Sequence, residues 1–122
     1  MIFAGICLIT KDVRRLSAFY KSILGTTSDC DDEIHQEIIT EGAALAILKN
    51  DDINIAGNSN MSMAFTVADV DIEFERLQKL GVDIVDPPTT RSWGARNMRF
   101  LDPDGNYIVF RSFQEHKYND LD

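Results

Sequence analysis

The chain of 122 residues has few of the residues that build covalent or metal frameworks. It contains only two cysteines, Cys7 and Cys30, and two histidines. Two cysteines without a close Cys or His partner in sequence match neither a disulfide framework nor a zinc knuckle. Because Cys7 lies in an apolar run, we expect it to be a small buried hydrophobic residue.

Long hydrophobic runs are also missing. No apolar stretch approaches the roughly 20 residues that a transmembrane helix needs. Residues 1–8 lack the basic start and the cleavage pattern of a signal peptide. The sequence therefore predicts no membrane partner and a cytoplasmic location.

Positive charge is scarce as well. The 12 Lys and Arg are outnumbered by 20 Asp and Glu, which gives a net charge of −8. Nucleic-acid binding depends on clustered Lys and Arg that release counterions, and the sequence has no such stripe. We expect no nucleic-acid partner. The acidic balance either suits a cationic small ligand or serves only solubility.

What the sequence does contain is an internal repeat. Each copy begins with an apolar strand (residues 2–9 and 62–67) and continues into a helix with one apolar stripe (14–24 and 72–80). Each helix is preceded by an Asp or hydroxyl residue that can cap it and followed by a Gly that can end it. Further extended segments follow in each copy, at 33–40 and 43–48 and then at 82–85, 96–101 and 107–110.

These segments predict an α+β fold. We expect a single domain over residues 1–122 that consists of two βαβββ modules, at about 2–49 and 61–112. The polar tail 113–122 is expected to fray or to serve a subunit contact. Pro87-Pro88 predicts a loop between two of the strands, and residues 102–106 predict a tight turn before the last strand.

Alternation along the strands predicts which side chains face the helices. In the second copy the large residues alternate with Ser62, Ala64 and Thr66, so the small residues should face away from the helix. Small residues on that face either leave room on a concave, ligand-binding surface or permit close packing to another sheet. The sequence leaves both readings open.

The repeat carries a resemblance to a known family. Asp12-Val13 precedes a helix that contains Phe19-Tyr20 and ends at Leu24-Gly25, and Asp102-Pro103-Asp104-Gly105-Asn106 precedes the last strand. The order and spacing of these motifs over roughly residues 2–112 resemble the vicinal oxygen chelate superfamily of glyoxalases, bleomycin-resistance proteins, fosfomycin-modifying transferases and extradiol dioxygenases. The resemblance implies paired modules with curved mixed sheets around a cleft, commonly in a homodimer.

The resemblance also implies where a metal would bind. Metal-dependent members use His, Gln or Glu on the first and last strands of each module, and the matching positions here are Gly5, Ala46, Ser62 and Val109. A divalent cation needs several converging N, O or S donors, which these four residues do not supply. We therefore expect no metal and no other cofactor. His35 and Glu37, which share a strand face, are the one alternative pair of donors, in a non-standard site.

Metal-free members of the bleomycin-resistance type bind a small molecule without transforming it, and the local match is Ser92-Trp93-Gly94-Ala95-Arg96. The candidate ligand-binding residues are Trp93 as a stacking surface, Arg96 and Arg111 for a carboxylate or phosphate, Tyr107 as an orienting hydroxyl, and Phe3 and Phe100 as apolar walls. Trp93 could instead close a loop over the core. Arg96 and Arg111 could each instead form a surface ion pair. The loop at residues 87–94 is a candidate lid.

No signature of another catalytic mechanism is present, so we assign no catalytic residue. The resemblance and the residues at these positions together imply a homodimeric protein that sequesters an antibiotic or metabolite in a metal-free cleft. One alternative is a metal-dependent lyase or isomerase of glyoxalase type with displaced ligands. A second is a non-catalytic interaction module whose cleft has closed.

Overall fold

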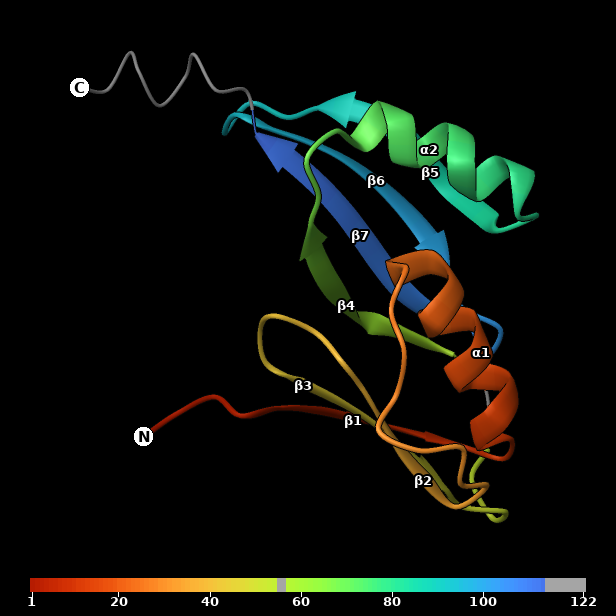
Figure 1. Ribbon diagram of the computed structural model, residues 1–122. Helices are drawn as coiled ribbons and strands as arrows, with labels where there is room; N and C mark the ends of the chain where they lie inside the picture. Colours follow the sequence, from red (N-terminus) through yellow and green to blue (C-terminus); the bar gives the residue numbers. More distant parts are fainter. Residues whose placement is uncertain (55–56, 114–122) are drawn as a thin grey trace. The chain divides into compact units, whose positions relative to one another are not determined.

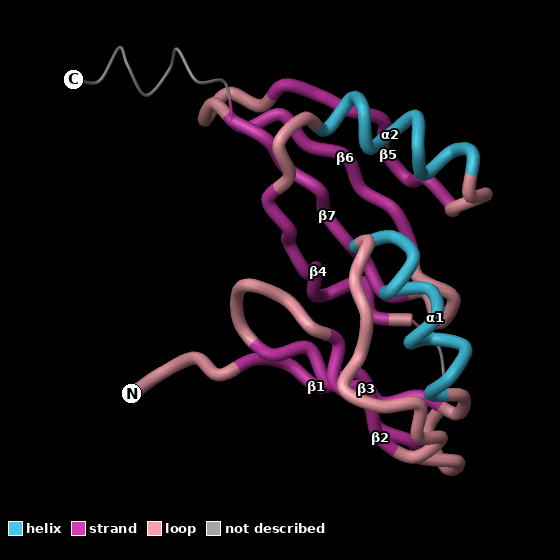
Figure 2. The backbone as a smooth tube through the Cα atoms, viewed as in Figure 1, coloured by secondary structure: helices cyan, strands magenta, loops and turns pink. Residues whose placement is uncertain are grey.

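The computed structural model describes residues 1–54 and 57–113 and divides into two compact units, Met1–Ala56 and Gly57–Asp122. In each unit one helix packs against a mixed sheet (Figures 1 and 2). The elements follow in the order β1 (Gly5–Thr10), α1 (Val13–Leu24), β2 (His35–Ile38), β3 (Ala44–Lys49), β4 (Asn58–Thr66), α2 (Val70–Lys79), β5 (Asp83–Thr90), β6 (Ala95–Leu101) and β7 (Asn106–Phe113).

The two sheets follow one plan, which confirms the predicted α+β architecture. The strand order is β1–β3–β2 in unit 1 and β4–β7–β6–β5 in unit 2. In both units the first strand pairs in parallel with the last strand, and the last strand pairs antiparallel with the one before it. The equivalent of β5 in unit 1 is reduced to a single bridge between Ser28 and Ile38.

Both predicted helices are present, but α1 begins one residue before the predicted range 14–24, and α2 begins two residues before the predicted range 72–80 and ends one residue before its end. Asp12 caps α1 by accepting a hydrogen bond from the backbone N of Arg15, and Asp69 caps α2 in the same way. Gly25 ends α1 in the left-handed conformation, with φ of 62°. The capping residues therefore fix the first helix at both ends and the second at its start.

The core of each unit lies between helix and sheet. In unit 1 the buried face of α1, which includes Leu16 and Tyr20, packs near Leu45 and Ile47. In unit 2 the buried residues come from α2 and the strands β6 and β7; they are Val70, Leu77, Met98, Phe100, Ile108 and Phe110. Cys7, which we expected to be buried, is exposed because it alternates onto the face of β1 away from α1.

The loop predicted at Pro87-Pro88 is not present, because β5 continues to Thr90. Proline has no N–H to donate, so it fits only an edge strand or a bulge. β5 is the edge strand of its sheet, and its register with β6 shifts between Asp86 and Thr89, where the two prolines lie. Edge position and irregular pairing together accommodate both residues.

Only the first residue of the polar tail predicted at residues 113–122 is described. Phe113 is the last residue of β7, and residues 114–122 lie outside the described residues. Neither α1 nor α2, the helices of the part described, is long and apolar enough to cross a membrane.

Candidate ligand-binding site

Each sheet has one face that the helix of its own unit does not cover, which we call the open face. In unit 2 the parallel register of β4 and β7 pairs Ser62 with Tyr107, Ala64 with Val109 and Thr66 with Arg111. The three β4 side chains of these pairs are exposed, whereas Met63 between them is buried. The predicted placement of small residues away from the helix is therefore confirmed.

Tyr107 and Arg111, two of the predicted ligand-binding residues, lie on this open face. Nε of Arg111 donates a hydrogen bond to Oγ1 of Thr66 at 3.1 Å, and the guanidinium lies 5.1 Å from the ring centre of Phe113. Neither partner is charged, and none of the carboxylates in residues 1–54 and 57–113 forms an ion pair with Arg111. The remaining N–H donors of the Arg111 guanidinium are therefore available to bind an anionic group.

Arg99 lies on the same face and was missed in the sequence analysis. It pairs in register with Val109, and its guanidinium lies 5.6 Å from the ring centre of Tyr107. Nε of Arg99 donates to Oδ2 of Asp86 at 2.6 Å. Strand alternation could have identified Arg99 from the sequence. A tight turn at residues 102–106 pairs Leu101 with Tyr107, and Arg99, two residues before Leu101, then lies on the face of Tyr107.

Arg96 lies on the opposite face of β6, so it does not join Tyr107 and Arg111. Its Nε and Nη2 donate to the two carboxylate oxygens of Asp71, both at 2.9 Å, and its Nη1 donates to Oγ1 of Thr90. These hydrogen bonds lower the pKa of Asp71 and raise the pKa of Arg96. The structure thus shows for Arg96 the surface ion pair that the sequence left open as its alternative.

The two phenylalanines predicted as apolar walls belong to different units of the chain. Phe100 pairs with Ile108, is fully buried, and packs edge to face on Phe110 with ring centres 5.0 Å apart. It is a core residue because it alternates onto the helix side of β6, so the predicted wall role is wrong. Phe3 belongs to unit 1, in the segment before β1, where its side chain is exposed.

Trp93 lies in the turn between β5 and β6. Backbone hydrogen bonds from Arg91 to Ala95 and from Gly94 to Arg91 close this turn, and Gly94 adopts a φ of 98°. The Trp93 side chain is 71% exposed, which contradicts a role in closing a loop over the core. Of the predicted lid, residues 87–90 belong to a strand, and only the turn at 91–94 remains.

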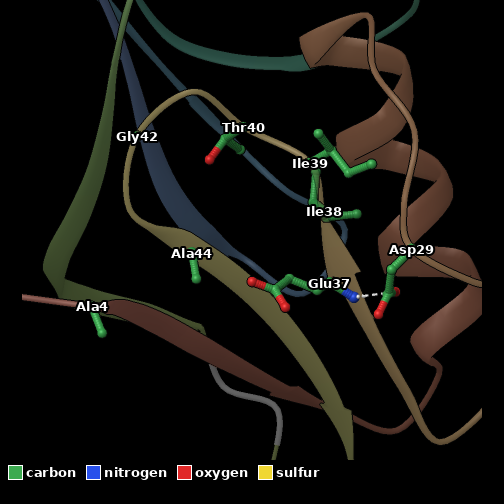
Figure 3. Close-up of a pocket in the computed structure, with 8 residues that line it drawn as sticks. All are labelled: Ala4, Asp29, Glu37, Ile38, Ile39, Thr40, Gly42 and Ala44. Atoms are coloured by element: carbon green, nitrogen blue, oxygen red, sulfur yellow. Dashed lines mark hydrogen bonds between the residues drawn. The ribbon is translucent and has the colours of Figure 1, made fainter.

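Unit 1 contains a hollow of about 470 Å³ at the end of its sheet where β2 turns into β3 (Figure 3). Its lining residues are Ala4, Asp29, Glu37, Ile38, Ile39, Thr40, Gly42 and Ala44. Oδ1 of Asp29 accepts a hydrogen bond from the backbone N of Glu37 at 2.9 Å. That hydrogen bond, with the Cys30 thiol and the charge of His35, lowers the pKa of Asp29.

The residues at the family's metal positions do not fit a metal ion. Gly5 and Ala46 have no donor side chain, Val109 has none, and Ser62 offers one hydroxyl. A Cβ atom at Gly5 would clash with the carbonyl group of Ala44, so the backbone there leaves no room for a ligating side chain. Among the described residues, no group of three or more His, Cys, Asp and Glu could hold an ion. His35 and Glu37 are therefore not part of such a group.

Comparisons with known proteins agree with this fold. Residues 2–110 match the model of the Glyoxalase/Bleomycin resistance protein/Dioxygenase superfamily. A search of curated proteins gave no match. Among solved structures, a protein of unknown function from Agrobacterium tumefaciens str. C58 is 27% identical, with a TM-score of 0.78 over 93% of this chain and 95% of that one.

Two further structures share the fold at lower identity. The genomically encoded fosfomycin resistance protein FosX from Listeria monocytogenes is 24% identical, with a TM-score of 0.76 over 96% of this chain and 98% of that one. TioX from Micromonospora sp. ML1 is 22% identical, with a TM-score of 0.73 over 90% and 97%. The family match spans nearly the whole sequence, and the chain therefore belongs to the Glyoxalase/Bleomycin resistance protein/Dioxygenase superfamily.

Proposed function

We propose that this protein binds a small organic molecule directly, without a metal ion, and holds it without converting it. The observation that carries the proposal is the open face of unit 2, where Arg111 has no carboxylate partner among the described residues and lies on the same face as Tyr107. A guanidinium is a planar fork of donors that suits a carboxylate or phosphate group of a ligand. The small side chains of β4 leave space for the rest of the molecule.

The choice of binding over metal chemistry rests on the donor set. Lewis-acid catalysis needs several protein ligands converging on one ion. The four family positions and the pair His35 and Glu37 do not supply them. The chemistry that remains on the open face is ion pairing, hydrogen bonding and stacking, which retain a ligand.

Antibiotics are the first compounds to test. The family's description includes bleomycin resistance proteins, and FosX is a fosfomycin resistance protein. We therefore propose a thermal-shift screen of antibiotics and carboxylated metabolites, followed by calorimetric titration of the strongest hit. Quenching of Trp93 fluorescence is a second readout, because Trp93 is the only tryptophan and is exposed.

Variants on the open face test the site itself. For an anionic hit, Arg111→Ala should weaken binding about tenfold or more, since a hydrogen bond to a charged group contributes about 1.5–3 kcal/mol. Tyr107→Phe should weaken it less. Arg14→Ala is the matched control, because Arg14 is an exposed arginine of α1 in the other unit.

Two outcomes would contradict the proposal. One is a hit that binds Arg111→Ala and Tyr107→Phe as tightly as the natural sequence, and the other is a screen in which no compound stabilises the protein. Elemental analysis of protein purified without chelator adds a separate check. About one tightly held ion per chain would favour the metal-dependent lyase or isomerase instead.

A further inference from the structure

The hollow of unit 1 takes no part in the proposed function. Its volume of about 470 Å³ falls within the range of about 300–1,000 Å³ that small-molecule pockets occupy. A bare metal ion would leave most of this space empty. Three of its apolar lining residues, Ala4, Ile39 and Ala44, reach the surface, whereas Ile38 is buried in the core, so the hollow suits a compact molecule with a hydrocarbon part.

The polar side chains of the hollow are all hydrogen-bond acceptors. They belong to Asp29, Glu37 and Thr40, and the Thr40 hydroxyl already donates its hydrogen to the carbonyl oxygen of Ala43 at 2.9 Å. None of the eight lining residues has a side-chain N–H group. The complementary ligand group therefore brings its own N–H donors.

Glu37 supplies the negative charge of the hollow that is not already bound. Asp29 is engaged by the backbone N of Glu37. The carboxylate of Glu37 has no hydrogen bond or ion pair to any residue in 1–54 or 57–113. Figure 3 shows this carboxylate turned away from Asp29 and toward the side of Ala44. The residue opposite Glu37 in the sheet is Ala46, which cannot neutralise it.

From these contacts we infer that the hollow of unit 1 binds an organic cation, an amine or guanidine with a compact apolar body, whose positive group pairs with Glu37. The net charge of −8 favours approach of such a cation. A hydrated divalent ion is a poor alternative, since calcium needs 6–8 oxygen ligands and the free carboxylate here is a single one. This site lies in a different unit from Arg111 and Tyr107, so it goes beyond the proposed function.

A pair of probes that differ only in charge tests the inference. Phenethylamine is a cation at neutral pH, and phenethyl alcohol is its neutral counterpart. In ¹H–¹⁵N correlation spectra of the full chain, phenethylamine should shift the amide signals of residues 37–44 in a saturable way. Phenethyl alcohol should bind there more weakly by up to about fivefold, the largest factor that corresponds to an exposed ion pair. Equal binding of the two probes, or no saturable shift with phenethylamine, would overturn the inference.

Substitution of Glu37 gives the matched test. Glu37→Gln should weaken phenethylamine binding by up to about the same factor of five, whereas Glu75→Gln, which removes the same charge from the exposed face of α2, should not. Glu37→Lys should reverse the preference, so that hydrocinnamate binds and phenethylamine does not. Unchanged phenethylamine binding in Glu37→Gln would refute the role of Glu37.

The inference and the proposed function can fail separately. Arg111→Ala should leave phenethylamine binding at residues 37–44 unchanged. If phenethylamine instead shifts only amides of β6 and β7, the cation site in unit 1 is wrong while binding on the open face of unit 2 stands.

Discussion

Asp102 shows how a single residue can determine a turn. Its Oδ1 accepts hydrogen bonds from the backbone N of Asp104 and of Asn106, both at 2.9 Å, and its Oδ2 accepts one from the Asn106 side chain. The residue is almost fully buried. The sequence predicted a tight turn in this segment, and these contacts confirm it.

Replacing Asp102 should therefore destabilise the protein. Asp102→Ala leaves the partly buried N–H groups of Asp104 and Asn106 without their acceptor, which should lower the free energy of unfolding by about 1–3 kcal/mol. Denaturant unfolding measures this difference. Asp52→Ala, at an exposed aspartate, should change it by less than about 0.5 kcal/mol. Equal stability of the two variants would refute the role of Asp102.

Gln36, in contrast, is a residue whose role the sequence does not reveal. It is fully buried, and its Oε1 accepts hydrogen bonds from the hydroxyls of Ser17 and Ser28, while its Nε2 donates to the carbonyl oxygen of Asp32. It thereby joins α1, the loop after it and β2. Strand alternation places Gln36 inward, but the sequence does not indicate which groups a single inward polar residue binds.

The Gln36 network predicts a specific pattern of stability changes. Gln36→Leu strands the Ser17 hydroxyl and the Asp32 carbonyl, so the free energy of unfolding should fall by about 1–3 kcal/mol. Combining Gln36→Leu with Ser17→Ala should cost less than the sum of the two single changes, because the double variant removes both partners. Full additivity in thermal unfolding experiments would contradict this account.

At the scale of elements, the helices were predictable and two strand features were not. Each helix carries its own stripe and its own cap at Asp12 or Asp69, so local sequence is sufficient. The extent of β5 depends on its edge position, which is a property of the whole sheet. In unit 1 the acidic segment before β2 forms side-chain turns, such as Asp32 Oδ1 with the Ile34 backbone N, in place of a full strand.

The ion pair between α2 and β6 predicts a pH dependence. Hydrogen bonds from Arg96 lower the pKa of Asp71 in the folded state, so the pair stabilises the fold above the unfolded pKa of about 3.9. That stabilisation is lost as the pH falls through the lower, folded pKa. The pair is exposed, so its contribution should be only about 0.2–1 kcal/mol.

Urea unfolding of the natural sequence and of Asp71→Asn checks this prediction. The natural sequence should be the more stable protein at neutral pH, and the difference should shrink as the pH drops below about 4. Asp52→Asn should show no such convergence. A difference that stays constant down to the most acidic condition would show that Asp71 acts in some other way.

At the scale of the whole molecule, the repeat and its motifs were sufficient to predict the family. The site was only partly predictable, because it depends on strand parity. Tyr107 and Arg111 follow directly from the last turn and reach the open face, whereas Arg96 and Phe100 lie on the helix side of β6. The one-domain assignment and the ligand role of Trp93 stay predictions.

The predicted homodimer also awaits a test. Large apolar side chains that are exposed in unit 1 include Met1, Ile2, Phe3, Ile9 and Leu48. Exposed apolar residues in such number commonly mark a protein interface. Light scattering coupled to gel filtration should give twice the mass of the chain. Phe3→Ser should shift the population toward the monomer, and a monomer at every concentration for the natural sequence would contradict the prediction.

The proposed function requires that the open face of unit 2 holds an organic molecule directly rather than through an ion. The most direct measurement is the dissociation constant of the strongest hit from the screen, once in excess EDTA and once with added Zn²⁺. Because guanidinium and phenol groups bind without a metal, the two constants should agree within about twofold. Binding that disappears in EDTA and returns with Zn²⁺ would contradict the account.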